Sequence, residues 1–149
     1  MRAALASLGL PLALALAATT AHAQPPAPSD AALQRLIDDY TGLYRRETLD
    51  QWRKLFLPSF VVASTRPDGS TQVRTLDEFF EAQREGFASA AMEEVLENVR
   101  SERRGPLASV WANFVFTSDG ASRRGRLVML CIAEQGVFRI HALLFSYYD

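Results

Sequence analysis

The chain has 149 residues, and its 16 lysines and arginines nearly balance 17 aspartates and glutamates, giving a formal net charge of −1. This balance argues against a protein that binds nucleic acid or an anionic membrane by charge alone. One cysteine and two histidines exclude an internal disulfide bond and argue against a zinc cluster of the usual kind.

The first 23 residues have the pattern of a cleavable secretory signal peptide. Arg2 supplies a positive charge, residues 3–18 are almost wholly apolar, and Ala21-His22-Ala23 offers a small-x-small cleavage site. The alternative is a membrane anchor, but the apolar run is shorter than the about 20 residues of a spanning helix and contains Pro11. We therefore expect a periplasmic or secreted protein with no membrane contact after cleavage.

Residues 24–29 contain three prolines and are predicted to form an extended linker. The expected domain spans residues 30–149. Its first helix is predicted over residues 30–46, because apolar side chains recur there with helical spacing, at Leu33, Leu36, Ile37, Tyr40, Leu43 and Tyr44.

Two further helices are predicted from their capping residues. A short one is expected to begin at Thr48, with Gln51 in the reciprocal capping position, and to end before Pro58. Another is expected to open at Thr75, where Glu78 completes a capping box three residues later.

The rest of the chain has the alternating pattern of β-strands. In the clearest stretch, every second residue from Ala108 to Phe116 is apolar, so one face is predicted to be buried. Strands are expected over residues 60–64, 92–103, 107–117, 124–133 and 137–148. This order predicts an α+β domain, in which a curved antiparallel sheet has helices packed on one face.

The order and spacing of these elements resemble the nuclear transport factor 2-like superfamily, which includes the SnoaL-like cyclases and the ketosteroid isomerases. The segments that carry the resemblance are residues 40–44, 49–56, 105–110 and 137–140. The resemblance implies a cone-shaped sheet with three N-terminal helices packed on its concave face, enclosing an apolar cavity.

The resemblance also implies a homodimer formed through the outer face of the sheet. This face is expected to be too apolar to remain wholly in water. On the family's register its side chains are Trp111, Asn113, Val115, Arg139, His141, Leu143 and Phe145.

The isomerase members use a tyrosine on the first helix, a protonated aspartate and a second aspartate as the base, a site that is one of the standard examples of a carboxylic acid kept neutral at pH 7. Tyr40 matches the family tyrosine, but the base position falls at Ser64, and residues 127–132 contain no carboxylate. Glu93, Glu94 and Glu97 are assigned no role. No catalytic residue is therefore predicted, and isomerase chemistry is not expected.

The remaining reactive side chains are given structural roles. Cys131 lies in an apolar run and is expected to be a buried apolar side chain. His141 is expected to point away from the cavity, without a partner to orient it as a base. The arginines at 103–104 and 123–126 flank opposite ends of one strand and are interpreted as solvated turn ends.

The preferred hypothesis is an exported domain that binds a small apolar or amphipathic molecule in its cone, without a cofactor, a metal or nucleic acid. Tyr40 and Ser64 are expected to orient the ligand, and the full predicted lining is Leu36, Tyr40, Trp52, Ser64, Phe80, Val110, Phe114 and Ile140. Two alternatives remain open. One is a dimeric interaction module whose cone is filled by its own side chains, and the other is an isomerase, cyclase or hydratase.

Overall fold

The computed structural model describes residues 27–66 and 68–148. The predicted signal peptide and the first part of the predicted linker, residues 24–26, lie outside these ranges. No helix in the described ranges is long and apolar enough to cross a membrane. The helices and strands, in chain order, are α1 (Asp30–Gly42), the 3₁₀ helix η1 (Arg46–Thr48), α2 (Leu49–Arg53), β1 (Phe56–Thr65), β2 (Thr71–Thr75), α3 (Leu76–Ser89), β3 (Met92–Arg104), β4 (Leu107–Ser118), β5 (Ala121–Glu134) and β6 (Val137–Tyr147).

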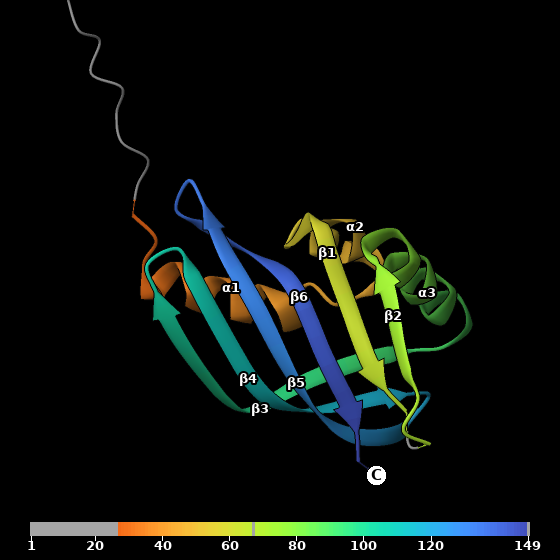
Figure 1. Cartoon of the computed structure of the whole chain (residues 1–149). Coiled ribbons are helices and arrows are strands. Elements are labelled where there is room, and N and C mark those ends of the chain that lie inside the picture. The colour runs from red at the N-terminus through yellow and green to blue at the C-terminus, as the bar shows by residue number, and fades with distance from the viewer. Residues whose placement is uncertain (1–26, 67, 149) are drawn as a thin grey trace, which may run out of the picture.

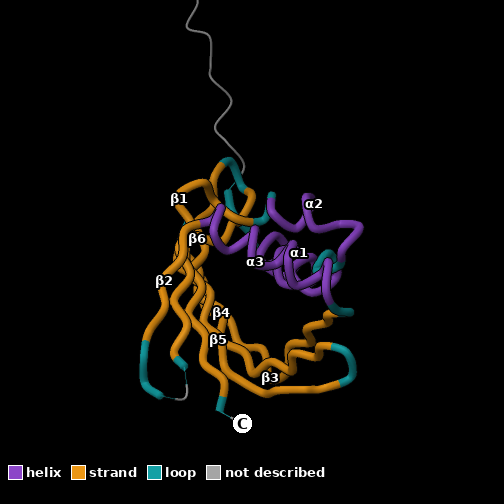
Figure 2. Tube along the Cα trace, turned by 90° about the vertical axis from the view of Figure 1, so that its right-hand side faces the viewer, coloured by secondary structure: helices purple, strands orange, loops and turns teal. Residues whose placement is uncertain are grey.

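The six strands form one sheet with the order β2-β1-β6-β5-β4-β3. Figure 1 and Figure 2 show the sheet curving around one side of the three α-helices, which lie on its concave face. The predicted α+β architecture is confirmed. The sheet is mixed, however, because β1 pairs with β6 in parallel while the other four pairings are antiparallel. In addition, α3 follows the β1–β2 hairpin, so the third helix comes after the sheet has begun.

Helix α1 begins as predicted and ends earlier than predicted. The Ser29 hydroxyl accepts a hydrogen bond from the Ala32 backbone N–H at 3.1 Å and caps the first turn. The helix ends at Gly42, four residues before the predicted end. The break allows Tyr44 to turn toward α3, where its hydroxyl donates a hydrogen bond to Oε1 of Gln83 at 2.5 Å. The early end of the helix thus coincides with a tertiary contact that the apolar periodicity does not predict.

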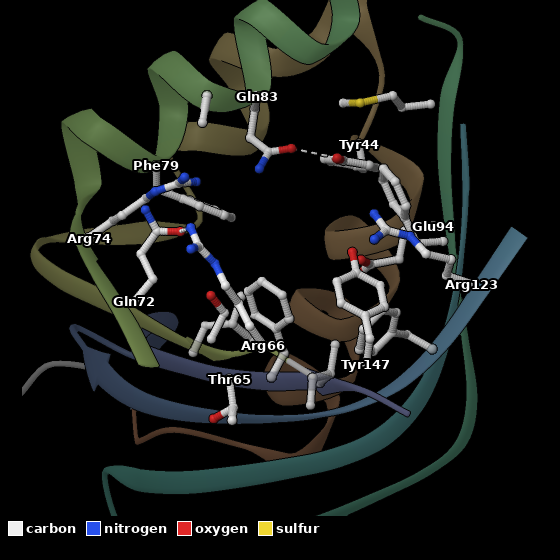
Figure 3. Close-up of a pocket in the computed structure, with 18 of the residues that line it drawn as sticks. Tyr44, Thr65, Arg66, Gln72, Arg74, Phe79, Gln83, Glu94, Arg123 and Tyr147 are labelled. Carbon is white, nitrogen blue, oxygen red and sulfur yellow. Dashed lines mark hydrogen bonds between the residues drawn. The ribbon is translucent and has the colours of Figure 1, made fainter. Parts of the chain in front are cut away.

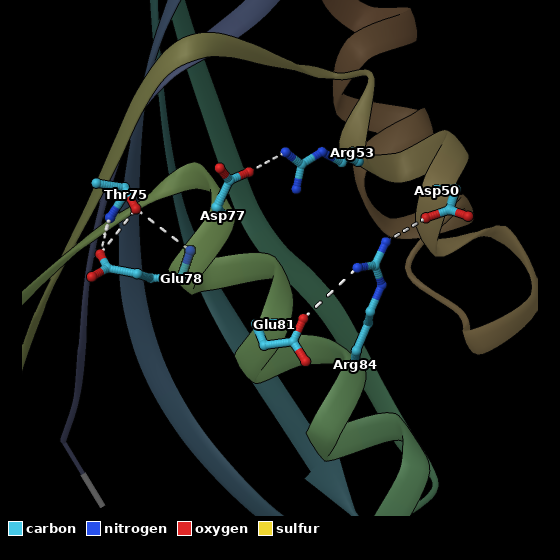
Figure 4. A network of polar contacts seen from close by, with 7 residues as sticks. All are labelled: Asp50, Arg53, Thr75, Asp77, Glu78, Glu81 and Arg84. Carbon is cyan, nitrogen blue, oxygen red and sulfur yellow. Dashed lines mark hydrogen bonds and ion pairs between the residues drawn. The ribbon is translucent and has the colours of Figure 1, made fainter.

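Helices α2 and α3 are joined by ion pairs (Figure 4). The predicted capping box of α3 is present between Thr75 and Glu78. The predicted capping of α2 by Thr48 is wrong, because the Thr48 hydroxyl instead donates to the Leu43 carbonyl at 2.8 Å. Two exposed ion pairs, Arg53–Asp77 and Arg84–Asp50, connect the helices. Such exposed pairs contribute at most about 1 kcal/mol each, so they orient α2 and α3 more than they stabilise them.

Trp52 is the centre of the aromatic core beneath the helices. Its side chain is 1% exposed, and its indole N–H donates to the Tyr40 carbonyl at 2.7 Å. Five rings surround the indole with centroids 4.8 to 5.9 Å away, in the tilted and edge-on arrangements that aromatic pairs prefer; they belong to Tyr40, Tyr44, Phe56, Phe79 and Phe80. This cluster fixes the helices to β1 and forms one wall of the space they cover.

A β-bulge in β6 changes which residues face the interior. The β5–β6 register shifts between Leu130 and Cys131, which leaves His141 as an extra residue. Leu143 beyond the bulge is therefore buried, while Leu144 is 47% exposed. The prediction that Leu143 and Phe145 lie on the outer face is wrong, because a bulge moves every later side chain of the strand to the opposite face.

Gly125 allows the sheet to pack closely at its centre. A Cβ atom at this position would overlap the Phe114 ring and the Ser146 carbonyl oxygen. Without a side chain at Gly125, the Phe114 ring can lie flat against β5, where it packs edge-on against Tyr147 with ring centroids 5.2 Å apart. Phe114 thereby becomes part of the concave wall.

Candidate functional site

A cavity of about 710 Å³ lies between the concave face of the sheet and the helices (Figure 3). Its volume is in the range of about 300 to 1,000 Å³ that is usual for small-molecule sites. All three α-helices and all six strands contribute side chains to its lining. The apolar part of the wall consists mainly of Phe79, Phe114, Leu127, Leu143 and Phe145.

The structure brings four of the predicted site residues to this cavity. They are Tyr40, Trp52, Ser64 and Phe114. The other predicted residues do not line it: Leu36, Phe80, Val110 and Ile140 belong to the close-packed core, and the last three are 0% exposed. The Phe80 ring lies 5.3 Å from that of Trp52, so helix packing occupies the space that the prediction left for a ligand. Ligand binding by the four lining residues stays a prediction.

Glu94 places a carboxyl group in the cavity wall. The residue lies on β3 opposite Phe116 of β4, and both side chains line the cavity. The residue as a whole is partly exposed, but its Oε1 atom is buried and has no hydrogen-bond partner in the described ranges. Burial raises the pKa of Glu94 from 4.5 to about 7, while hydrogen bonding by Tyr40 opposes this rise.

Three tyrosine hydroxyl groups surround this carboxyl group. Burial raises the pKa of Tyr40 well above its ordinary value, and the neighbouring Glu94 raises it further. Burial, again with a smaller contribution from Glu94, also raises the pKa values of Tyr44 and Tyr147. All three phenols therefore stay protonated at neutral pH; Tyr44 donates its proton to Gln83 and Tyr40 hydrogen-bonds Glu94, which leaves the Tyr147 hydroxyl as a donor for a ligand.

Arg123 closes this polar side of the cavity. Its guanidinium lies 4.3 Å from the centre of the Tyr147 ring, in a cation–π arrangement. Figure 3 shows Arg123 beside Glu94 and Tyr147. Arg123 is exposed, as the interpretation of the arginines at 123–126 as solvated turn ends implies, but it also lines the cavity, which that interpretation did not include.

The opposite side of the cavity is formed by the β1–β2 hairpin. Arg66, Gln72 and Arg74 line the cavity there together with Ser64. Arg66 donates a hydrogen bond from Nη2 to Oε1 of Gln72 at 3.2 Å. The cavity thus has an apolar middle between two polar sides, one with a carboxyl group and phenols and the other with guanidinium groups (Figure 3).

Glu94 was missed although the sequence contains a signal for it. The neighbours two residues away on the same strand, Met92 and Leu96, both pack against the core. Since side chains alternate along a strand, a carboxylate between two apolar residues on one face is a candidate for burial. Arg123, Arg66 and Arg74 carry no such signal, because arginines at strand ends are usually solvated.

The other reactive side chains lie away from the cavity. Cys131 is buried, and burial raises the pKa of its thiol to about 12. His141 lies at the bulge, with Nδ1 3.2 Å from the Ser59 hydroxyl, and does not line the cavity. In residues 27–66 and 68–148, no group of three or more His, Cys, Asp and Glu side chains has the arrangement of a metal site.

Comparison with known proteins finds similarity at the level of structure. No protein-family model and no curated protein sequence matches the chain. Among solved structures, a candidate scytalone dehydratase of Novosphingobium aromaticivorans aligns with a TM-score of 0.66 at 14% identity, covering 80% of this chain and 83% of that one. A candidate dehydratase from the nuclear transport factor 2-like family of Streptomyces avermitilis aligns with a TM-score of 0.65 at 12% identity, covering 80% and 95%.

A similar match extends to a longer protein. Bd1075 of Bdellovibrio bacteriovorus aligns with a TM-score of 0.66 at 8% identity, and the alignment covers 80% of this chain but 40% of Bd1075. At such identities the likeness establishes the fold. The chain has the nuclear transport factor 2-like fold, as its sequence pattern indicates.

Proposed function

We propose that this domain binds a small amphipathic molecule in the cavity between its sheet and its helices. The observation that carries the proposal is a cavity of about 710 Å³ whose largely apolar wall includes Glu94, a residue whose buried Oε1 atom lacks a partner in the described ranges. A buried polar atom without a hydrogen bond costs about 1 to 3 kcal/mol. A ligand that donates a hydrogen bond to Glu94 would remove this cost.

The cavity favours a binding protein over an interaction module with a filled cone. The large aromatic side chains, with Trp52 at their centre, fill only the space against the helices. Beyond them the concave face stays open, with Phe114 and Phe145 as its apolar surface. An amphipathic ligand matches this combination of an apolar wall with a few polar groups.

Native mass spectrometry of the chain without residues 1–23, purified from its own compartment, tests the proposal. We expect a retained molecule whose mass disappears on denaturation. Ala82 of α3 lines the cavity, so Ala82→Trp should reduce the occupied fraction at least tenfold by filling the space. Glu85→Trp, which places the same side chain on the exposed face of α3, is the matched control and should retain the ligand.

Two outcomes would contradict ligand binding. One is a wild-type protein that carries no added mass even after incubation with a lipid and metabolite extract. The other is equal occupancy in the Ala82→Trp and Glu85→Trp variants, which would place the bound molecule outside the cavity.

The native mass spectrum also gives the oligomeric state, and we propose that the chain forms a homodimer. The outer face of the sheet supports this proposal, because large apolar side chains are exposed there, including Trp111 at 39%, Leu130 at 43% and Leu144 at 47%.

We also propose that the domain works in the periplasm or outside the cell, on the basis of the signal-peptide pattern in residues 1–23.

A second candidate function is proton transfer on the bound molecule. A carboxyl group with a pKa of about 7 is suited to exchange protons at neutral pH, and Glu94 has this property beside the Tyr40 hydroxyl. Ionised Glu94, hydrogen-bonded by Tyr40, would remove a proton next to a carbonyl group, while the Tyr147 hydroxyl would donate a hydrogen bond to the carbonyl oxygen. Two of the similar solved structures are of candidate dehydratases.

Proton exchange of 2-tetralone in D₂O, followed by NMR, tests this second function. We expect the wild-type protein to accelerate exchange next to the carbonyl group, with a rate that rises through pH 7 as Glu94 ionises. Glu94→Gln should slow the exchange about 100-fold or more. The control Glu93→Gln changes the exposed neighbour and should behave as wild type. Equal rates in wild type and Glu94→Gln would remove Glu94 from the chemistry.

A further inference from the structure

The arginines that line the cavity form no ion pair with a carboxylate in the described ranges. Six ion pairs are present in the described ranges, and none involves Arg66, Arg74 or Arg123. All three of these arginines line the cavity. Their charge therefore remains available to a molecule that enters it.

The strand register places the hairpin groups on one face. Val62 pairs with Arg74 and Ser64 pairs with Gln72, so these four side chains share the concave face with Arg66. Along β1 this face changes from the buried Val62 to Ser64, and the exposed Arg66 follows directly after the strand. The wall thus changes from apolar to cationic toward its outer end.

Most N–H donors of the two hairpin arginines, Arg66 and Arg74, have no partner in the described ranges. The bond from Arg66 to Gln72 engages Nη2 at 3.2 Å and leaves most of the five guanidinium N–H groups of Arg66 available. Hydrogen bonds from the Thr75 N–H and hydroxyl lower the pKa of Glu78, and the charge of Arg74 contributes less. Arg74 makes no hydrogen bond or ion pair with a described carboxylate.

The acidic groups that line the cavity, Asp68 and Glu94, form no ion pair with the hairpin arginines. Asp68 lies in the hairpin turn, and its Oδ1 atom accepts hydrogen bonds from the Ser70 N–H at 2.8 Å and the Ser70 hydroxyl at 2.6 Å. Glu94 lies on the opposite side of the cavity (Figure 3). The charges of Asp68 and Glu78 partly balance the two hairpin arginines, but the guanidinium N–H donors of Arg66 and Arg74 form no ion pair in the described ranges and lie next to an apolar wall.

We propose that the ligand is an amphipathic carboxylate, whose apolar body lies against Phe79, Phe114 and Phe145 and whose carboxylate is bound by Arg66 and Arg74. This inference rests on the proposed ligand binding and adds the chemical class of the ligand. Guanidinium groups bind carboxylates through paired N–H donors, and such charge-assisted hydrogen bonds are about twice as strong as neutral ones.

Titration with 2-naphthoate and with its neutral analogue 2-naphthamide tests the inference. The two probes share an apolar body of similar shape and differ in charge. Binding is followed by the fluorescence of Trp52, which lines the cavity, at pH 6, where Glu94 is mostly protonated. We expect the wild-type protein to bind 2-naphthoate at least tenfold more tightly than 2-naphthamide.

The double variant Arg66→Gln with Arg74→Gln should reduce this preference to less than twofold without changing the affinity for 2-naphthamide. The matched control, Arg126→Gln with Arg139→Gln, removes the same charge from two exposed positions outside the cavity and should keep the preference. Equal binding of both probes by the wild type, or a preference that persists in the hairpin variant, would overturn the carboxylate proposal alone. Failure of both probes to bind would overturn the proposed cavity function as well.

Discussion

Replacing Trp52 by alanine is expected to lower the free energy of unfolding by about 3 to 5 kcal/mol, the range measured for large aromatic side chains removed from protein cores. The indole is 1% exposed, and its removal would leave the surrounding rings of Tyr44, Phe56 and Phe80 without their common partner. The Tyr40 carbonyl would also lose the hydrogen bond that the indole N–H donates at 2.7 Å. Both losses occur where the helices meet the sheet, so we expect the whole domain to be affected.

Urea unfolding followed by far-ultraviolet circular dichroism measures this change. Val73→Ala is a suitable control, because Val73 is 65% exposed on the edge strand β2 and its truncation should change stability by no more than about 0.5 kcal/mol. A loss below about 1.5 kcal/mol in Trp52→Ala would show that the aromatic cluster is looser than its ring contacts indicate.

Replacing Glu94 by glutamine is expected to change how stability depends on pH. The pKa of Glu94 is raised from 4.5 to about 7, so between these values the folded chain binds the proton more tightly than the unfolded chain. This contribution favours folding most below pH 4.5 and is lost as the pH rises through 7. From pH 5 to pH 8 the wild-type protein should therefore lose about 2 to 3 kcal/mol that Glu94→Gln does not lose.

Urea unfolding of both proteins at pH 5 and pH 8 gives this difference directly. Any constant cost of burying the glutamine amide cancels, because it is present at both pH values. Glu93→Gln, on the exposed face of the same strand, should follow the wild-type pH dependence. Parallel pH profiles for wild type and Glu94→Gln would mean that the carboxyl group is hydrated in the folded chain.

The fold was predictable where local patterns and tertiary packing agree. The alternation from Ala108 to Phe116 and the capping box at Thr75 predicted β4 and α3 correctly. The errors occur where a distant contact decides the local structure. The hydrogen bond of Tyr44 to Gln83 accompanies the early end of α1, and the extra residue His141 reverses the faces of β6. Neither the Tyr44–Gln83 hydrogen bond nor the bulge at His141 changes the hydrophobic periodicity of its own segment.

The candidate site was predictable only in part, for a related reason. Tyr40 and Phe114 were predicted to line the cavity because their side chains lie on apolar faces and match the family pattern. Glu94 was not, although its position between Met92 and Leu96 on one strand face indicates burial. Arg123 was not, because the side chains that surround it come from other elements of the fold. Whether a charged side chain is solvated or encloses a ligand depends on the curvature of the sheet, which periodicity does not describe.

The parallel pairing of β1 with β6 has a consequence for the order in which the chain folds. Val62 pairs with Leu143, 81 residues later, so the β1 edge of the β1–β2 hairpin stays unpaired until residues 137–147 have been synthesised. Contacts between such distant segments slow folding, because a long loop must close before they form. An incomplete chain would therefore expose the hydrogen-bonding edge of β1, and such an unpaired edge favours association with strands of other chains.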